Sequence, residues 1–146
     1  MTFAVRQLAV ASGAAAISFV VPGVPVPWAR AGSHGKRRFT PPMQFAYMTA
    51  VRFNALTAMR GLRKLDGAVE LTVTAVWPWP EKYSARRRVQ PGADRKATKP
   101  DASNVVKIIE DALIGIVFTD DARVSDLVVR KRYGDHPGVT IQVRGA

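Results

Sequence analysis

The chain contains no cysteine and only two histidines among its 146 residues. The lack of cysteine excludes a disulfide framework, a cysteine-based zinc site and a thiol nucleophile. It also fits a protein that works in a reducing compartment. His34 and His136 each stand alone in a segment rich in glycine and proline, so we expect both to be ordinary surface residues.

Acidic residues are scarce as well. The 11 Asp and Glu are outnumbered by 22 Lys and Arg, which gives a formal charge of +11. Hydrophobic residues make up 47% of the chain, enough for the core of one folded domain, so the excess charge must lie on its surface. A surface of this sign favours a polyphosphate such as nucleic acid, or an anionic membrane, as partner. Composition alone leaves both partners open.

No apolar run is long enough for a clear transmembrane helix. The chain opens with MTFAVRQLAVASGAAAISFVV, in which one Arg precedes an apolar stretch as in a secretory signal. This stretch continues without interruption into the β-branched residues typical of a strand. We therefore predict that residues 1–16 form a loosely held N-terminal extension and that one domain occupies residues 17–146. A cleaved signal remains the alternative.

The spacing of apolar residues predicts a mixed α/β domain with the element order β-α-β-α-β-β. Strands are predicted for AISFVVPGV and for the alternating GAVELTVTAVWPWP. Residues 122–134 and 138–145 predict two more strands, joined by the turn GDHPG.

Two helices are predicted from apolar residues at helical spacing. The first is an amphipathic helix over residues 44–64, whose apolar positions are Phe45, Met48, Val51, Phe53, Ala55, Leu56, Met59 and Leu62. The second covers residues 102–113, with Gly115 as its C-terminal cap. Its apolar stripe consists of Val105, Ile108, Ile109, Ala112 and Leu113, and its opposite side carries Asn104, Lys107 and Asp111.

Positive charge concentrates in residues 36–38 and in residues 79–100, which lack an apolar period. The second segment can be a solvated loop or an arm that contacts phosphates, with Trp77, Trp79 and Tyr83 beside its charges. The predicted nucleic-acid contacts are Lys36, Arg37, Arg38, Arg86, Arg87, Arg88, Arg95, Lys96 and Lys99. Trp28 and Trp79 can stack on bases or cover the core from a loop. Because the basic clusters lie on loops rather than on an amphipathic helix, a membrane partner is disfavoured.

Five of the eleven acidic residues gather in KPDASNVVKIIEDALIGIVFTDD, residues 99–121. Asp120 and Asp121 are adjacent, and neighbouring carboxylates raise each other's pKa unless a cation lies nearby. Magnesium is typically held by one or two carboxylates and by substrate phosphate. We therefore predict that Asp101, Asp120 and Asp121 are metal ligands, and that Lys107, roughly 9 Å along the helix from Asp101, reaches a phosphate oxygen. Helix capping by Asp101 and a tight turn at the aspartate pair are the structural alternatives.

In this order and spacing, KPDASNVVK, EDAL-x-G and TDDARV resemble the RusA family of Holliday-junction resolvases. The usual core of that family reads PD-x-DN-x-x-K, DAL-x-G and DD-x-x-V. The resemblance extends to ISFVVPGVPVPWAR, KRRFTPP and VVRKRYG, and so covers about residues 17–144. It implies a homodimer in the cytoplasm, associated with the nucleoid, that serves DNA recombination and repair. The implied activity is paired phosphodiester cleavage of four-way DNA junctions with Mg²⁺, or Mn²⁺ in its place.

The resemblance also implies roles for single residues. Asp101 and Asp121 match metal-binding carboxylates and Lys107 matches the catalytic lysine, whereas Asn104, Asp111 and Asp120 match supporting positions. Ser103 departs from the pattern, because the family usually has an aspartate there. This removes one negative charge, for which Asp120 is the candidate to compensate. A protein that binds junctions or other nucleic acid without cutting them is therefore the alternative function.

Overall fold

A computed structural model describes residues 9–11, 14–30, 32–34, 37–39 and 42–146. None of the helices in these ranges has the length and apolar character that a membrane span requires.

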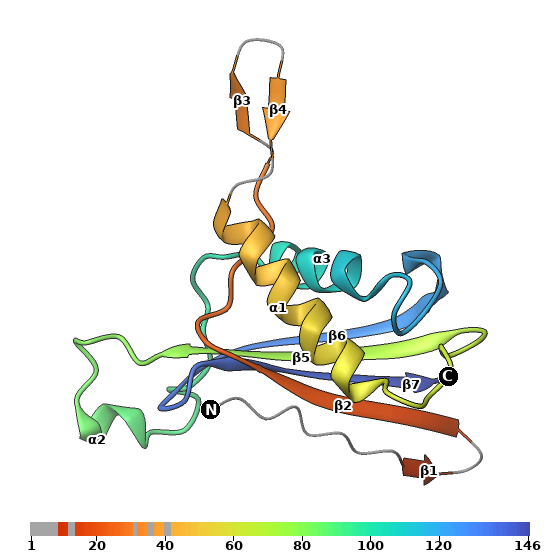
Figure 1. Ribbon diagram of the computed structural model, residues 1–146. Helices are drawn as coiled ribbons and strands as arrows, with labels where there is room; N and C mark the ends of the chain where they lie inside the picture. The colour runs from red at the N-terminus through yellow and green to blue at the C-terminus, as the bar shows by residue number, and fades with distance from the viewer. Residues whose placement is uncertain (1–8, 12–13, 31, 35–36, 40–41) are drawn as a thin grey trace.

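A five-stranded mixed sheet forms the centre of the molecule (Figure 1). Its strands, in spatial order, are β1 (Ala9–Ala11), β2 (Ala14–Pro22), β7 (Gly138–Gly145), β5 (Val69–Pro78) and β6 (Val124–Gly134). All neighbouring strands are antiparallel except β5 and β6, which are parallel. The turn after β6 leads to β7, yet β5 lies between these two strands, so β6 is left at one edge of the sheet.

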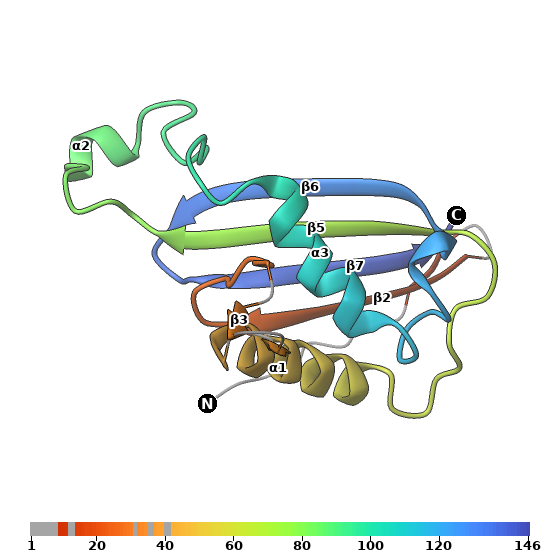
Figure 2. The same cartoon turned by 90° about the horizontal axis from the view of Figure 1, so that it is seen from above.

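The two long helices, α1 (Pro42–Ala58) and α3 (Ala102–Leu113), cover the same face of the sheet. Viewed from above, α1 runs beside β2 and α3 crosses the middle strands (Figure 2). Alternate residues of β5 turn toward the helices and are buried, as expected for a strand with one core face. The largest fully buried side chains include Phe19, Leu71, Ile108, Phe118 and Ile141. The predicted mixed α/β fold is confirmed, and α3 has the predicted bounds and the predicted buried stripe.

The N-terminal part of the chain differs from the prediction. The first long strand begins at Ala14, and Ala9–Ala11 pair with it as β1, so residues 9–11 and 14–16 of the predicted extension belong to the sheet. Residues 1–8 lie outside the described residues. The pairing was not foreseen because alanine has a low strand propensity, whereas the backbone hydrogen bonds of a hairpin do not depend on side-chain type.

The first basic cluster also lies in a different element from the one predicted. A short antiparallel ribbon of β3 (Gly32–His34) and β4 (Arg37–Phe39) replaces the predicted loop. Figure 1 shows this ribbon projecting from the helix-covered side of the sheet. Arg37 and Arg38 lie on β4, and Lys36 is outside the described residues.

Helix α1 corrects the prediction of a single apolar stripe over residues 44–64. It ends at Ala58, and its apolar residues point in two directions. Tyr47, Val51, Ala55 and Ala58 are buried. The side chains of Phe45, Phe53 and Leu56, which were predicted to belong to the core stripe, are exposed instead. The reason is geometric: at about 100° per residue these three positions lie on the side of the helix opposite the buried four.

Candidate nuclease groove

The start of α3 is fixed on the edge strand β6. The Lys131 side chain on β6 donates hydrogen bonds of 2.7 Å to the carbonyl oxygens of both Thr98 and Pro100. Asp101 occupies the N-cap position, but its side chain makes no capping hydrogen bond. Its carboxylate instead accepts a 2.9 Å hydrogen bond from Lys99. This bond and the charge of Lys99 hold the pKa of Asp101 below its usual value.

An open groove of about 600 Å³ lies between α3 and β6. The residues that line it from α3 are spaced so that they share one face of the helix. Leu127 and Val129 of β6 form the opposite wall. A short 3₁₀ helix, Asp121–Arg123, contributes Asp121. The lining residues from α3 are Ala102, Ser103, Val106, Lys107, Glu110 and Asp111. The structure therefore brings Lys107, Asp111, Asp121 and Ser103 to one groove.

Glu110 is a groove residue that the sequence reasoning missed. It is half-buried, and its pKa is raised by burial first and then by the charges of Asp121 and Asp111. The positive charge of Lys107 lowers the pKa of Glu110 and so opposes these effects. The signal was present in the sequence, because Glu110 follows Lys107 by three positions and Ser103 by seven, a spacing that keeps all three on one side of a helix.

The predicted ligand set of Asp101, Asp120 and Asp121 is not assembled. The Asp120 side chain accepts a 2.9 Å hydrogen bond from the backbone N–H of Ala122, so it caps the 3₁₀ helix as in the turn alternative. Asp101 is paired with Lys99 at the start of α3. Within the described part of the chain, no group of three or more Asp, Glu, His or Cys residues is close enough to hold a metal ion. The two adjacent aspartates thus have different surroundings: Asp120 caps the turn, and Asp121 lines the groove.

Glu110 and Asp121, which line the groove, carry the kind of oxygen ligand that a hard divalent cation takes. Asp121 raises the pKa of Glu110, which shows that these carboxylates repel each other. A cation with oxygen ligands would relieve that repulsion. Magnesium needs only one or two carboxylates, because water and substrate phosphate complete its coordination.

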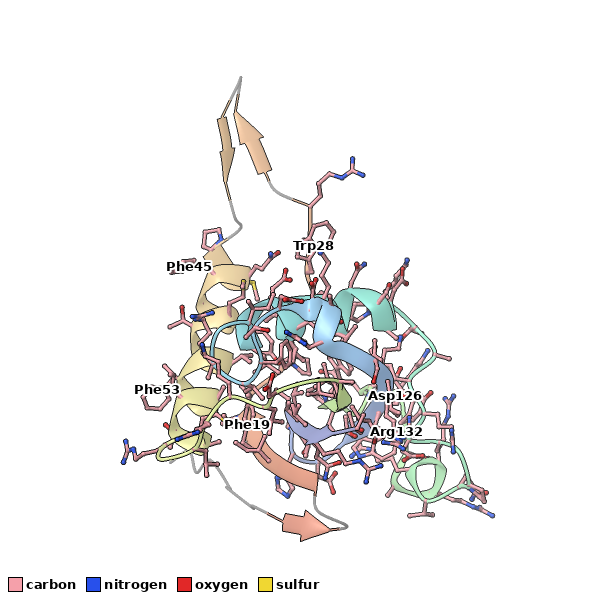
Figure 3. The ribbon with its side chains drawn as sticks, turned by 90° about the vertical axis from the view of Figure 1, so that its right-hand side faces the viewer. Phe19, Trp28, Phe45, Phe53, Asp126 and Arg132 are labelled. Atoms are coloured by element: carbon pink, nitrogen blue, oxygen red, sulfur yellow. The ribbon has the colours of Figure 1, made fainter. Side chains whose placement is uncertain are left out.

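Lys107 is held beside an aromatic ring. Its Nζ lies 5.2 Å from the centroid of the Trp28 ring, within the range of a cation–π interaction. The loop that carries Trp28 is fixed by two hydrogen bonds of 2.8 Å. The Trp28 backbone N–H donates to the carbonyl of Asn104, and that of Ala29 donates to Oε1 of Gln44. Figure 3 shows Trp28 on the helix-covered side of the sheet. Asn104 thus contributes its carbonyl to this support and is not among the groove-lining residues.

Residues 79–100 form an arm that is attached to the end of β6. The rings of Trp79, Tyr83 and Tyr133 pack together, with centroids 5.7 to 6.0 Å apart. The backbone N–H of Lys96 donates to the carbonyl of Lys131, and that of Tyr133 donates to the carbonyl of Asp94, so the returning part of the arm is bridged to β6. The segment is therefore packed against the end of β6, and its contact with phosphates stays a prediction.

The arm presents cations on aromatic rings. Within it, the short helix α2 (Ala85–Arg88) begins at Ser84, whose hydroxyl accepts a hydrogen bond from the Arg87 backbone. The Arg87 guanidinium lies 3.7 Å from the Tyr83 ring centroid, and that of Arg88 lies 5.5 Å from the Trp79 centroid. The predicted contacts Arg86, Arg95 and Lys99 are exposed, whereas Lys96 is half-buried.

Comparison with known proteins identifies the family. The family model described as Endodeoxyribonuclease RusA matches residues 22–144. The chain belongs to the RusA endodeoxyribonuclease family. An uncharacterized protein of Bacillus subtilis (strain 168), YqaN, is 32% identical over 135 residues, which cover 88% of this chain and 95% of that protein.

Family membership makes the exchange at Ser103 more informative. Ser103 lies in the same groove as Glu110 and Asp121. The groove of this RusA-family chain thus has a neutral hydroxyl where the usual motif has a carboxylate, and a glutamate two helical turns farther along.

We expect the raised pKa of Glu110 to fall in Asp121→Asn, because the repulsion by Asp121 is removed while the burial remains. Asp120→Asn is the matched control, since Asp120 caps the turn outside the groove, and it should leave this pKa unchanged. NMR titration of the Glu110 carboxyl carbon measures both. Equal pKa values in the two variants would contradict the arrangement. Because folding raises this pKa, the stability contribution of Glu110 is lost as the pH rises through the folded-state value.

Proposed function

We propose that this RusA-family chain is a magnesium-dependent endonuclease that resolves four-way DNA junctions by paired phosphodiester cleavage, with Mn²⁺ able to replace Mg²⁺. The groove that combines Lys107 with Glu110, Asp111 and Asp121 is the observation that carries the proposal. A lysine beside repelling carboxylates suits a phosphodiester that arrives with a divalent cation. Its place of action would be the DNA of the cytoplasm, in recombination and repair.

Asp121 and Glu110 would hold the ion. When bound, a divalent cation supplies a Lewis acid for the phosphate and lowers the pKa of water. The Lys107 ammonium would stabilise negative charge that develops on the phosphate oxygens in the transition state. Trp28 limits the positions that this flexible side chain can take. The Ser103 hydroxyl would donate a hydrogen bond to a phosphate oxygen at the start of α3.

Asp101 holds the position of a metal-binding carboxylate in the family motif but is paired with Lys99 in this structure. Lys99 is itself a proposed DNA contact, and its side chain is 86% exposed. A DNA phosphate that competes for Lys99 would free the Asp101 carboxylate. Asp101 would then add a negative charge at the end of the groove where Ser103 lies.

Binding would depend on the arm and on the ribbon that carries Arg37 and Arg38. Arginine side chains contact phosphates regardless of the DNA sequence, and such binding weakens as salt concentration rises. The aromatic rings of Trp79 and Tyr83 offer surfaces on which unpaired bases at a junction can stack. Two strands are cut in a junction, so two grooves are needed, which a homodimer with two-fold symmetry supplies.

Replacing Asp121 by Asn should lower the cleavage rate of a four-way junction by at least about 100-fold, because a ligand of the cation is lost. Asp120→Asn should cut at the parent rate, since Asp120 caps a turn. Gel assays with labelled junctions measure the rate, and filter binding shows whether both variants still bind DNA. Full activity in Asp121→Asn would refute the assignment of the groove.

The exchange at Ser103 favours a second candidate function, a junction-binding protein that does not cut. Ser103→Asp should lower the magnesium concentration needed for half-maximal cleavage by roughly 10-fold, because it adds a carboxylate to the groove. Gln142→Glu adds the same charge on the opposite face of the sheet and should change nothing. If the parent binds without cutting and only Ser103→Asp cuts, the second function is correct.

Trp28→Leu should slow single-turnover cleavage about 3- to 30-fold, the size expected for one cation–π contact. Trp28→Phe retains an aromatic face and should keep most of the rate. Junction affinity should stay the same in both variants. In a Lys107→Met background, Trp28→Leu should have no further effect. Additive losses in the double variant would show that Trp28 acts through stability and not through Lys107.

A further inference from the structure

The sheet has a second face, which neither long helix covers. In Figure 1, α1 and α3 both lie on one side of the sheet. Residues of β5 alternate between that side, where Leu71 and Val73 are buried, and the opposite side, where Glu70 and Thr72 are half-buried. We call the side with Glu70 and Thr72 the open face. The groove between α3 and β6 lies on the helix-covered side, so a site on the open face is separate from it.

The open face contains a hollow of about 420 Å³. Ser18 of β2 and Thr72 of β5 are in register with the same residue of β7, so they lie in one row across the sheet. Glu70, Arg130 and Arg144 also line the hollow, and their side chains are longer. A row of short side chains between longer ones leaves room for a ligand, and both hydroxyl groups can donate or accept hydrogen bonds.

The charged groups of the hollow lie at two ends. Arg144 and Glu70 are in register on neighbouring strands and form an ion pair, in which Nη2 lies 3.1 Å from Oε2. Arg130 is in register with Thr74, four residues along β5 from Glu70, which is roughly 13 Å at the rise of a strand. Among the described residues, the Arg130 side chain has no hydrogen-bond or ion-pair partner. One end therefore offers an unpaired cation, and the other a carboxylate whose charge Arg144 offsets.

These two ends restrict the chemistry of the ligand. A phosphate group suits Arg130, because a guanidinium binds phosphate oxygens through two parallel N–H donors. At the other end, the Glu70 carboxylate repels a second phosphate and accepts hydrogen bonds from hydroxyl groups. None of the lining residues that the structure describes is aromatic, so the hollow offers no ring on which a base can stack. A phosphate joined to a sugar with free hydroxyl groups meets all these conditions.

We propose that the hollow on the open face is a binding site for a phosphorylated sugar. The phosphate accepts hydrogen bonds from Arg130, whose long side chain shortens the span between the two ends of the hollow. The sugar hydroxyls donate to Glu70 and bond with the hydroxyl groups of Ser18 and Thr72. A phosphorylated sugar occurs as a free metabolite and at the 5′ end of a DNA strand, and the hollow fits the chemistry that both share.

The first test is the binding of ribose 5-phosphate without DNA or metal, so that nuclease activity plays no part in it. NMR titration should show saturating shifts of the Ser18 and Thr72 backbone amides. Arg130→Met should raise the dissociation constant at least about 10-fold, because charge-assisted hydrogen bonds to the phosphate are lost.

Lys107→Met is the matched control, because it removes one cation from the groove instead of the open face. It should leave the dissociation constant unchanged. Arg130 and Lys107 are both exposed, so both variants should fold like the parent. Equal weakening in the two variants, shifts confined to the groove, or no saturating shift in the parent would overturn the proposal.

The second test asks whether the sugar is recognised as well as the phosphate. Ribose 5-phosphate should bind at least about 10-fold more tightly than inorganic phosphate, because its hydroxyl groups add hydrogen bonds. Glu70→Ala should abolish this preference, since the acceptor for the sugar hydroxyls is lost. Equal affinity of the parent for the two probes would mean only that a basic protein attracts anions, and it would overturn the proposal.

A short DNA strand with a 5′ phosphate, compared with its unphosphorylated copy, distinguishes the two sources of the ligand. If only the phosphorylated strand shifts the Ser18 and Thr72 amides, the site takes the end of a DNA strand. If neither strand does so and ribose 5-phosphate does, the site takes a free sugar phosphate. Equal shifts with both strands would show binding of internal phosphodiesters and would overturn the proposal.

Discussion

The structure depends on the amphipathic character of α3. One side of this helix carries Val105, Ile108, Ile109, Ala112 and Leu113, all buried against the sheet and α1. Burying that stripe fixes the rotation of the helix about its axis. The rotation in turn determines that Ser103, Lys107 and Glu110 face β6. The groove is therefore a consequence of core packing, because burial of the apolar stripe alone places its polar side chains on the side that faces β6.

The edge position of β6 completes this arrangement. β6 pairs with β5 only on its inner side, which leaves its outer side for the groove and for the arm. Lys131 ties the segment before α3 to β6, and the arm continues from the same strand end through Tyr133. The basic arm and the acidic groove thus lie on the same edge of the sheet. Under the proposed function, a DNA strand held by the arm would lie close to the carboxylates, although the protein as a whole repels cations.

Helical periodicity in the sequence predicted α3 with its bounds, its buried stripe and its polar side. The same periodicity also places Glu110 on the polar side of α3, although the motif marks only aspartates as site residues. The ligand set could not be derived from spacing, because whether Asp101 meets Lys99 or Asp120 caps a turn depends on side-chain conformations that spacing does not determine. In α1, apolar residues recur at helical spacing on both the inner and the outer side of the helix, so the spacing does not tell which side is buried. Only the packed structure shows that Phe45 and Phe53 face outward. The packing of residues 79–100 on β6 could not be derived from the sequence, since the contact of Trp79 with Tyr133 joins residues far apart in the chain.

The central claim is that one groove holds a divalent cation and cuts a junction strand. The most direct measurement is the fate of a labelled four-way junction, and of a linear duplex of the same sequence, incubated with the parent protein with and without magnesium. The account predicts paired nicks in the junction only, and only with magnesium. A junction that is bound yet stays intact in both magnesium and manganese would contradict it.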